Sequence, residues 1–325
     1  MKRLLRSLLP HESFMVLMAL VLSLVVVIGS SIIPEWPKVL LHMGEVVLII
    51  GGMAFLSRDL DRSHSALQWF YAIPLIPVFF KNVEYLTQPL YDPNNDQILI
   101  AADRILCGGA NPTQWIYQHG LTCPALTEFL MICYSLFYFL PTAIAIEFYV
   151  SARRMEKSGQ DATMLWKRLE QIFFVVVYGF LLSYFCYLFL PSVGPRFTLH
   201  NFLSMSHDLP GLFVTEPIRT LLNRGENILP SMSLPEIIHV VTRDAFPSGH
   251  TDVTLLTIVL AFKWRAKLRW PVTIIGAGLL ISTVYLRYHY VVDVLGGAVL
   301  ATFTLYTWEW VRSSTLAIRN RIVSS

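Results

Sequence analysis

Three short strings of residues in this chain have the types and spacing to carry out chemistry. They are Gly194-Pro195-Arg196, Pro247-Ser248-Gly249-His250 and the segment His289–Asp293. Residues four apart share one helical face, so the third string places a carboxylate behind an imidazole. Such a carboxylate fixes the imidazole tautomer and leaves the other nitrogen free as a nucleophile. Because an arginine offers a planar fork to phosphate oxygens, the set indicates phosphoryl transfer.

The second string also predicts a binding site for an anion. Pro247 and Ser248 suit the opening turn of a helix, as a first-turn proline and a cap. The first backbone N–H groups of a helix have no internal partner, and the helix dipole favours negative charge there. Gly249 would let a ligand approach the backbone closely. We therefore expect phosphoryl oxygens at this helix start.

Each string also has a purely structural interpretation. A Gly-Pro-Arg sequence is often only a turn, and a PSGH sequence can be only a helix cap. A histidine with an aspartate one turn later can anchor a helix at the membrane interface or bind a metal ion. Ionisable groups near a membrane are costly unless they are used. The occurrence of all three strings in order, on one predicted side of the membrane, favours the functional interpretation.

The composition indicates a membrane protein. Of the 325 residues, 54% are hydrophobic and only 14% are charged, against about 25% charged in soluble domains. This excludes a disordered chain, a coiled coil and an ordinary cytosolic enzyme. The net charge of +3 gives no argument for nucleic acid, and four cysteines are too few for a disulfide scaffold. Eight stretches approach the 20 apolar residues of a span: 14–33, 39–56, 65–80, 125–150, 169–190, 249–263, 271–288 and 290–311.

The loop charges predict the orientation of these spans. The third span holds Pro74 and Pro77 and has a re-entrant loop as its alternative. With eight spans and a cytoplasmic N-terminus, 17 of the 25 Lys and Arg residues fall on the cytoplasmic side. Both termini are then cytoplasmic, and all three strings face outward. We expect a retained first helix and a location in a bacterial inner membrane.

The predicted fold is all-α, a polytopic membrane bundle of about eight helices with short interfacial helices on the outer face. These interfacial helices come from the two long outer segments, 81–124 and 192–246, whose amphipathic pieces include 97–106, 111–120, 212–223 and 234–241. Residues 1–124 are expected to be accessory, residues 125–312 to form the catalytic core, and residues 313–325 to be a cytoplasmic tail.

The three strings resemble the motifs of the type 2 phosphatidic acid phosphatase superfamily, which includes the vanadium haloperoxidases. The second family motif, Pro-Ser-Gly-His, matches completely, and the third matches in His289 and Asp293. Thr283 stands where the third motif has arginine, and Phe189 stands where the first motif has lysine. The stretch around Asp103 and the SGHT and HYxxDV strings also resemble the inositol phosphotransferase and sphingomyelin synthase branch.

This resemblance implies a role for each matching residue. His289 would attack phosphorus and form a phosphohistidine, and Asp293 would orient it. His250 would protonate the leaving oxygen and then activate the acceptor. The resemblance also implies that Arg196 and the backbone of Ser248 and Gly249 bind the phosphoryl oxygens.

Two further arginines are candidates to replace the missing cations of the family motifs. They are Arg243 and Arg287, and the alternative for Arg287 is an arginine that snorkels to the interface. Arg287 lies two residues before His289, so in a continuous helix it would point away. No third or fourth ligand stands at metal-site spacing, so we expect neither a metal nor a cofactor.

The expected function is that of a phosphatase acting on a lipid phosphomonoester at the outer face. The alternative is a phosphotransferase that moves a phosphorylated head group from a phospholipid to an alcohol. A scaffold or transporter that has lost activity is less favoured, because the two histidines and the aspartate are intact. The substrate partner would be a lipid phosphate or phospholipid in the bilayer. The sequence leaves open the lipid, the acceptor and the oligomeric state.

Several other polar residues keep two interpretations. Cys107 and Cys123 share one outer segment and would pair in an oxidising compartment or remain free thiols. Asp103 and Arg104 would form an interface pair or touch substrate. Asp252 would be a charge at a helix start or part of the site.

Overall fold

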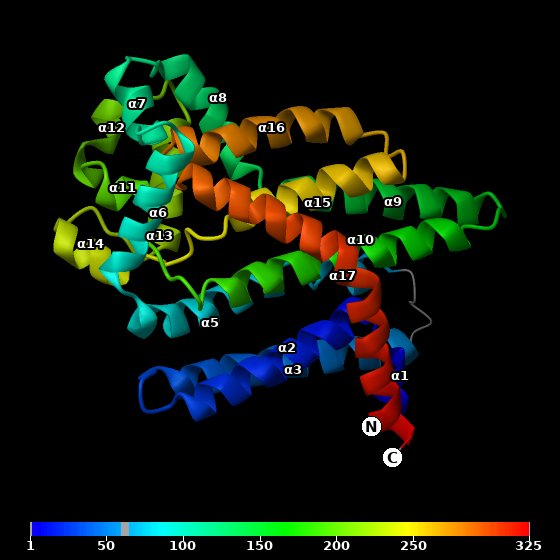
Figure 1. Ribbon diagram of the computed structural model, residues 1–325. Helices are drawn as coiled ribbons and strands as arrows, with labels where there is room; N and C mark the ends of the chain where they lie inside the picture. Colours follow the sequence, from blue (N-terminus) through cyan, green and yellow to red (C-terminus); the bar gives the residue numbers. More distant parts are fainter. Residues whose placement is uncertain (1, 60–64, 325) are drawn as a thin grey trace.

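The computed structural model describes residues 2–59 and 65–324, and its ordered elements are helices (Figure 1). The apolar sequence, with few internal prolines, favours helices because every backbone group can then bond within its own segment. The helices are α1 (Lys2–Ser7), α2 (Pro10–Ile28), α3 (Trp36–Asp59), α4 (Ala66–Phe70), α5 (Leu75–Leu90), α6 (Pro93–Leu106), α7 (Pro112–Gln118), α8 (Pro124–Ser135), α9 (Phe139–Lys157), α10 (Thr163–Cys186), α11 (Pro195–Thr198), the 3-10 turn η1 (Phe202–Ser204), α12 (Met205–Asp208), α13 (Thr215–Gly225), α14 (Leu234–Val240), α15 (Gly249–Lys263), α16 (Arg269–Tyr285) and α17 (Val291–Ser324).

The all-helical membrane bundle is confirmed, but the count of eight spans is not. Within the described residues four helices are long and apolar enough to cross a membrane, namely α2, α3, α10 and α17. The predicted span 125–150 is a pair of helices, α8 and α9, bent by 54°. Counting that pair as one span gives five. The predicted spans 249–263 and 271–288 form helices of only 15 and 17 residues, α15 and α16.

The predicted third span is broken into two short helices. Helix α4 ends at Phe70, and α5 begins only at Leu75 after a turn that contains Pro74. Proline lacks a backbone N–H and therefore cannot continue the hydrogen-bond ladder of the preceding helix. The four amphipathic pieces of the outer segments do form helices, which are α6, α7, α13 and α14.

Helix α10 is the centre of the bundle. Fourteen of its 24 residues are buried, and it packs against α2, α5, α9, α15 and α17. Aromatic rings join the N-terminal helix to it, since the Phe14 ring lies 5.6 Å from Phe174 and 5.5 Å from Tyr178 between centroids. The helices predicted to be accessory therefore share one core with the rest of the bundle.

The two ends of the bundle differ in composition and structure. Helices α6, α7 and α11 to α14 gather at one end, and the turns α9–α10 and α15–α16 lie at the other (Figure 1).

Residues 313–324, predicted as a tail, continue α17, and Arg319 Nη1 donates to the Leu8 carbonyl at 2.8 Å. The domain boundaries themselves stay a prediction. All four cysteines are free thiols, including Cys107 and Cys123.

A buried carboxylate holds the chain at the start of α13. Glu128 of α8 accepts hydrogen bonds from four successive backbone N–H groups, those of residues 212–215, at 2.6–3.1 Å. It also accepts the hydroxyl of Thr215 at 2.6 Å. Two of these N–H groups, those of the N-cap Val214 and of Thr215, open α13 and have no partner inside it, so an acidic side chain satisfies them and complements the helix dipole. This fixes α13 over the end of the bundle that holds the three strings.

Candidate active site

The PSGH string forms the predicted helix start. Ser248 is the N-cap of α15, and its Oγ accepts the Thr251 N–H at 3.2 Å. Pro247 precedes this cap, so it lies outside the first turn and not within it as predicted. The string therefore presents His250 on the second residue of a well-capped helix.

Gly249 is required by helix packing. A Cβ atom at this position would lie 2.4 Å from the Tyr187 hydroxyl and 3.1 Å from Ser183 Oγ. Both side chains come from the C-terminal end of α10, so only glycine lets α15 start this close to it. This contact accounts for a glycine at position 249 without the close approach of a ligand that the sequence suggested.

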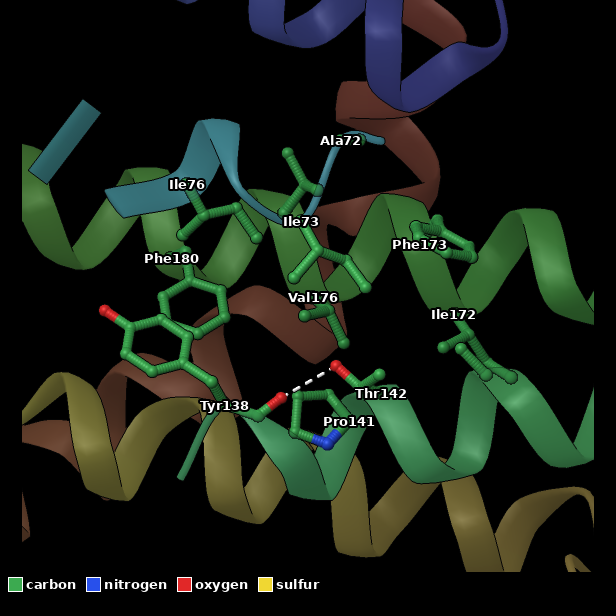
Figure 2. Close-up of a pocket in the computed structure, with 12 residues that line it drawn as sticks. Ala72, Ile73, Ile76, Tyr138, Pro141, Thr142, Ile172, Phe173, Val176 and Phe180 are labelled. Carbon is green, nitrogen blue, oxygen red and sulfur yellow. Dashed lines mark hydrogen bonds between the residues drawn. The ribbon is translucent and has the colours of Figure 1, made fainter. Parts of the chain in front are cut away.

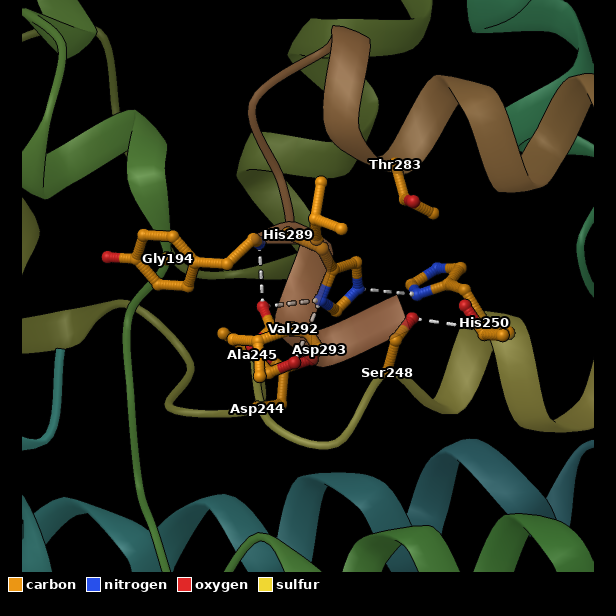
Figure 3. A network of polar contacts seen from close by, with 12 residues as sticks. Gly194, Asp244, Ala245, Ser248, His250, Thr283, His289, Val292 and Asp293 are labelled. Atoms are coloured by element: carbon orange, nitrogen blue, oxygen red, sulfur yellow. Dashed lines mark hydrogen bonds and ion pairs between the residues drawn. The ribbon is translucent and has the colours of Figure 1, made fainter. Parts of the chain in front are cut away.

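The two histidines face each other. His289 Nε2 lies 3.2 Å from His250 Nδ1, and His289 Nδ1 lies 2.8 Å from the Ala245 carbonyl oxygen (Figure 3). A carbonyl can only accept, so Nδ1 of His289 carries the proton and Nε2 keeps its lone pair. Burial lowers the pKa of His289 to about 4. The ring is therefore neutral at neutral pH, with a free nitrogen directed at His250.

Asp293 lies behind His289 but shares its role with the backbone. Its Oδ2 is 3.4 Å from His289 Nδ1 and accepts the Tyr290 N–H at 2.8 Å. Helix α17 begins at Val291, so the histidine stands just before the helix and the aspartate in its first turn. The Ala245 carbonyl makes the shorter contact with the ring, so the tautomer does not depend on the carboxylate alone.

Arg196 is buried beside these histidines with its charge already paired. Its Nη2 donates to Glu226 at 2.5 Å, and its guanidinium carbon lies 4.5 Å from the Tyr288 ring centroid and 4.6 Å from that of Phe197. Among the described residues, Nε and Nη1 have no hydrogen-bond partner. Buried polar groups are normally satisfied, so two donors stand ready for an acceptor.

The backbone donors at this helix start differ from those predicted. The Ser248 N–H donates to the Asp293 carbonyl at 2.9 Å, so it is not free for a phosphoryl oxygen. For the next two amides, those of Gly249 and His250, no acceptor exists in the described part of the chain. These are the orphan donors that a helix N-terminus offers to an anion. The sequence interpretation had assigned Ser248 and Gly249 and had missed the His250 amide.

The structure does not bring Arg243 or Arg287 into contact with the histidine pair. Arg243 donates to the carbonyls of Val241, Ile238 and His239 at the end of α14. Arg287 is almost completely buried and donates to Asp208 Oδ2 at 2.8 Å. Its φ of 67° places it in the turn between α16 and α17, so the continuous helix assumed above does not exist there.

The two other family positions that lack a cation hold Phe189 and Thr283, which carry no charge. Phe189 is 73% exposed. Thr283 contributes its backbone carbonyl, which accepts the N–H groups of Tyr288 and His289 at 3.0 and 2.9 Å. The loop that carries His289 is therefore tied to the last turns of α16.

Two carboxylates of α6 hold the loops of the first and third strings. Asp96 accepts the N–H groups of Val193 and Gly194 at 3.2 and 3.1 Å and the hydroxyl of Tyr290 at 2.9 Å. Burial raises the pKa of Asp96, and these hydrogen bonds oppose that shift. One aspartate thus joins the turn before Arg196 to the residue after His289.

Asp103 caps the helix that carries Asp293. It accepts the N–H groups of Val291 and Val292 at 3.1 and 2.8 Å, at the first two positions of α17. Burial raises the pKa of Asp103, against the effect of these two bonds. The expected pair of Asp103 and Arg104 is not formed among the described residues, because Asp103 makes these backbone contacts and Arg104 bonds separately to Asn111 at 2.8 Å.

A cavity of about 410 Å³ adjoins His250. Glu226 and Asp244 line it together with Gly249, and no lysine or arginine in the described part of the chain does. Six aromatic residues of its wall come from the α8–α9 bend and from the C-terminal half of α10 and the residue after it: Tyr134, Phe137, Tyr138, Phe180, Tyr184 and Tyr187. Its size is in the range of small-molecule pockets.

A second cavity, which shares Tyr138 and Phe180 with the first, is apolar and much smaller (Figure 2). Its volume is about 30 Å³, and Thr142 is its only hydroxyl besides that of Tyr138. The Thr142 hydroxyl donates to the Tyr138 carbonyl at 2.7 Å. This space is too small for a lipid head group. Within the described residues no three His, Cys, Asp or Glu side chains are grouped to hold a metal ion.

Comparison with known proteins identifies the family. The family model described as the PAP2 superfamily matches residues 97–307, more than half of the chain. No curated protein and no solved structure matches significantly. The matched range contains both histidines, Asp293 and Arg196, and it begins within α6. This all-helical membrane protein therefore belongs to the PAP2 superfamily, and this membership supports a phosphatase- or phosphotransferase-type function on phosphate esters.

Proposed function

We propose that this protein breaks a P–O bond of a lipid phosphate ester through a phosphohistidine at His289. The observation that carries the proposal is the pair of contacts on the His289 ring. Nδ1 donates to the Ala245 carbonyl at 2.8 Å, so the lone pair of Nε2 is directed toward His250 Nδ1, 3.2 Å away. A neutral imidazole with a fixed tautomer is the activated form of a histidine nucleophile.

In the first half-reaction, Nε2 of His289 attacks phosphorus and the bond to the leaving alcohol oxygen breaks. The bonding electrons go to that oxygen, which takes the Nδ1 proton of a protonated His250. An anionic phosphate beside His250 favours the protonated imidazole. In the second half-reaction, an acceptor gives its proton to His250 as its oxygen bonds to phosphorus. The P–N bond then breaks, and its electrons return to Nε2.

The phosphoryl oxygens are assigned to the unsatisfied donors around the pair. These are Nε and Nη1 of Arg196 and the amides of Gly249 and His250. Such donors are arranged before the reaction and strengthen as charge develops on the oxygens in the transition state.

The charges of the site favour a phosphodiester over a phosphomonoester. A monoester carries nearly two negative charges at neutral pH, since its second pKa is about 6, whereas a diester carries one. Arg196 is already paired with Glu226 at 2.5 Å, and Phe189 and Thr283 replace the two other cations of the family motifs. Hydrolysis of a monoester is the first expectation from the sequence. The ion pair now favours the second candidate, transfer of a phosphorylated head group from a phospholipid.

The site is assigned to the extracytoplasmic face of a bacterial inner membrane, with both termini cytoplasmic. The assignment rests on the 17 of 25 Lys and Arg residues that the predicted topology places inside. It is supported by the position of α6, α7 and α11 to α14 at the end opposite the α9–α10 and α15–α16 turns.

The test is turnover of a lipid panel by the purified full-length protein. Each lipid is offered with and without a long-chain alcohol, and both free phosphate and new phospholipids are measured. Phosphate release indicates a phosphatase, and a new head-group product without phosphate indicates a transferase. Quenching the reaction in alkali and locating a phosphorylated peptide by mass spectrometry should find the label on His289. Turnover with the label on another residue would refute the nucleophile.

A further inference from the structure

The cavity beside His250 carries more negative than positive charge. Glu226 and Asp244 both line it. Among the described residues, the one cation in contact with either carboxylate is Arg196, which bonds to Glu226. Asp244 bonds only to the Thr242 hydroxyl, at 2.6 Å, among the described residues. Burial and the neighbouring Glu226 raise the pKa of Asp244, and the charges of His289 and Arg196 oppose that shift.

The rest of the wall suits a cation as well. Tyr138 stacks on Phe180 with ring centroids 5.5 Å apart, and Tyr184 lies 6.0 Å from both Phe180 and Tyr187. Tyr134 continues this surface to the active site, since its ring stacks on His250 at 4.7 Å. The faces of aromatic rings attract ammonium groups, most strongly where water is excluded.

The anion site and this cavity are neighbours. Gly249 and His250 belong to both, because their amides open α15 and both residues line the cavity. Arg196 connects the two regions, with one nitrogen on Glu226 and two buried nitrogens unsatisfied. A single ligand that carries a negative group next to a positive group would satisfy both regions at once.

We propose that the cavity holds the ammonium end of a zwitterionic phospholipid head group while its phosphodiester lies at His289. The inference rests on the proposed function and adds the class of substrate to it. Asp244 and the tyrosine rings bind the ammonium group, either primary or fully methylated. Arg196 and the α15 amides bind the phosphate, and the lipid chains stay outside the cavity.

Turnover of matched phospholipids tests the preference. The full-length protein is reconstituted in nanodiscs with lipids that share acyl chains and differ in head group: choline, ethanolamine, glycerol, inositol, or none as in phosphatidic acid. The expected result is a kcat/KM at least about 10-fold higher for the two cationic head groups, the size of one desolvated cation–aromatic contact. Equal or faster turnover of the glycerol, inositol or head-group-free lipid would overturn the inference and leave the proposed function standing.

Two variants and one conservative control test whether the cavity causes the preference. Asp244→Asn keeps the shape of the side chain, and Tyr184→Leu removes a ring while Tyr184→Phe keeps it. Asp244→Asn and Tyr184→Leu should reduce the ratio of cationic to neutral turnover by about 10-fold, and Tyr184→Phe should preserve it. A ratio unchanged in both Asp244→Asn and Tyr184→Leu would refute the assignment of the cavity.

A binding measurement separates failure of the inference from failure of the proposed function. The His289→Ala variant is titrated calorimetrically with phosphocholine and with glycerol 3-phosphate. Tighter binding of phosphocholine, weakened by adding Asp244→Asn, supports the cavity even if no lipid is turned over. Equal or weaker binding of phosphocholine would contradict it.

Discussion

Replacing Asp293 by asparagine should slow the chemistry less than in an enzyme whose histidine relies on one carboxylate. In serine proteases the equivalent change costs about 10⁴-fold, because the amide stabilises the wrong tautomer. Here the Ala245 carbonyl accepts the Nδ1 proton at 2.8 Å, so the tautomer survives. The substitution removes the negative charge of Asp293 Oδ2, which lies 3.4 Å from His289 Nδ1 and stabilises the ring as it becomes positive during the reaction.

The magnitude follows from that distance. Coulomb's law with an effective dielectric constant of about 20 gives about 5 kcal/mol for unit charges 3.4 Å apart. This is an upper bound, because the asparagine oxygen still accepts the Tyr290 N–H and directs its dipole at the ring. Losing about half of it corresponds to a rate reduction of about 10²-fold, and losing most of it to about 10³-fold.

The assay is kcat per folded molecule, with thermal stability in detergent as a check on folding. Asp252→Asn is the matched control, because Asp252 is also a fully buried carboxylate in a first helical turn, and neither of its oxygens has a described partner. The control should keep turnover within about threefold. If Asp293→Asn also stayed within threefold, the carboxylate would be structural. A loss of 10⁴-fold or more would mean that Ala245 does not hold the tautomer.

Four further predictions concern the same site. His289→Ala should abolish turnover, and His250→Ala should reduce kcat by about 10²–10⁴-fold as expected for a general acid, with full activity in either variant contradicting the assignment. Burial lowers the pKa of His289 to about 4, so His289 should become protonated, and kcat/KM should fall, only as the pH drops through about 4. A fall of kcat/KM near pH 6.5 would indicate a solvated ring. Vanadate should inhibit as a mimic of five-coordinate phosphorus, and a chelator should not; recovery by a divalent ion after chelation would refute metal independence. Ser231→Cys, in a chain whose exposed Cys123 is changed to Ser, should react with an impermeant thiol reagent on intact cells. Labelling only after lysis would show that the orientation in the membrane is opposite to the predicted one.

The sequence predicted those parts of the site that depend on local chemistry. Ser248 is a helix cap because its hydroxyl bonds to an amide three residues away, and this pattern is visible within four letters. The short outer helices follow from local amphipathic periodicity in the same way. His289 and Asp293 come together because they are one turn apart.

Contacts between distant segments were beyond such reasoning. The Ala245 carbonyl that holds His289 is a backbone atom 44 residues away and has no side-chain signature. Asp103 caps α17 across 188 residues. The turn at Arg287, where the chain adopts a φ of 67°, was not anticipated when a continuous helix was considered for this segment. The 54° bend between α8 and α9 was missed because hydrophobicity continues through it.

The two aspartates of α6 have a practical consequence for anyone who makes a shorter version of this protein. A chain cut at residue 125 would keep every residue assigned to the chemistry and would look complete by motif. It would lose Asp96, which bonds to Val193, Gly194 and Tyr290, and Asp103, which caps Val291 and Val292. Four backbone N–H groups near the reaction centre would then lose their acceptor, and the Tyr290 hydroxyl would keep only its bond to Thr198. The smallest useful fragment must therefore begin before Asp92, the cap of α6.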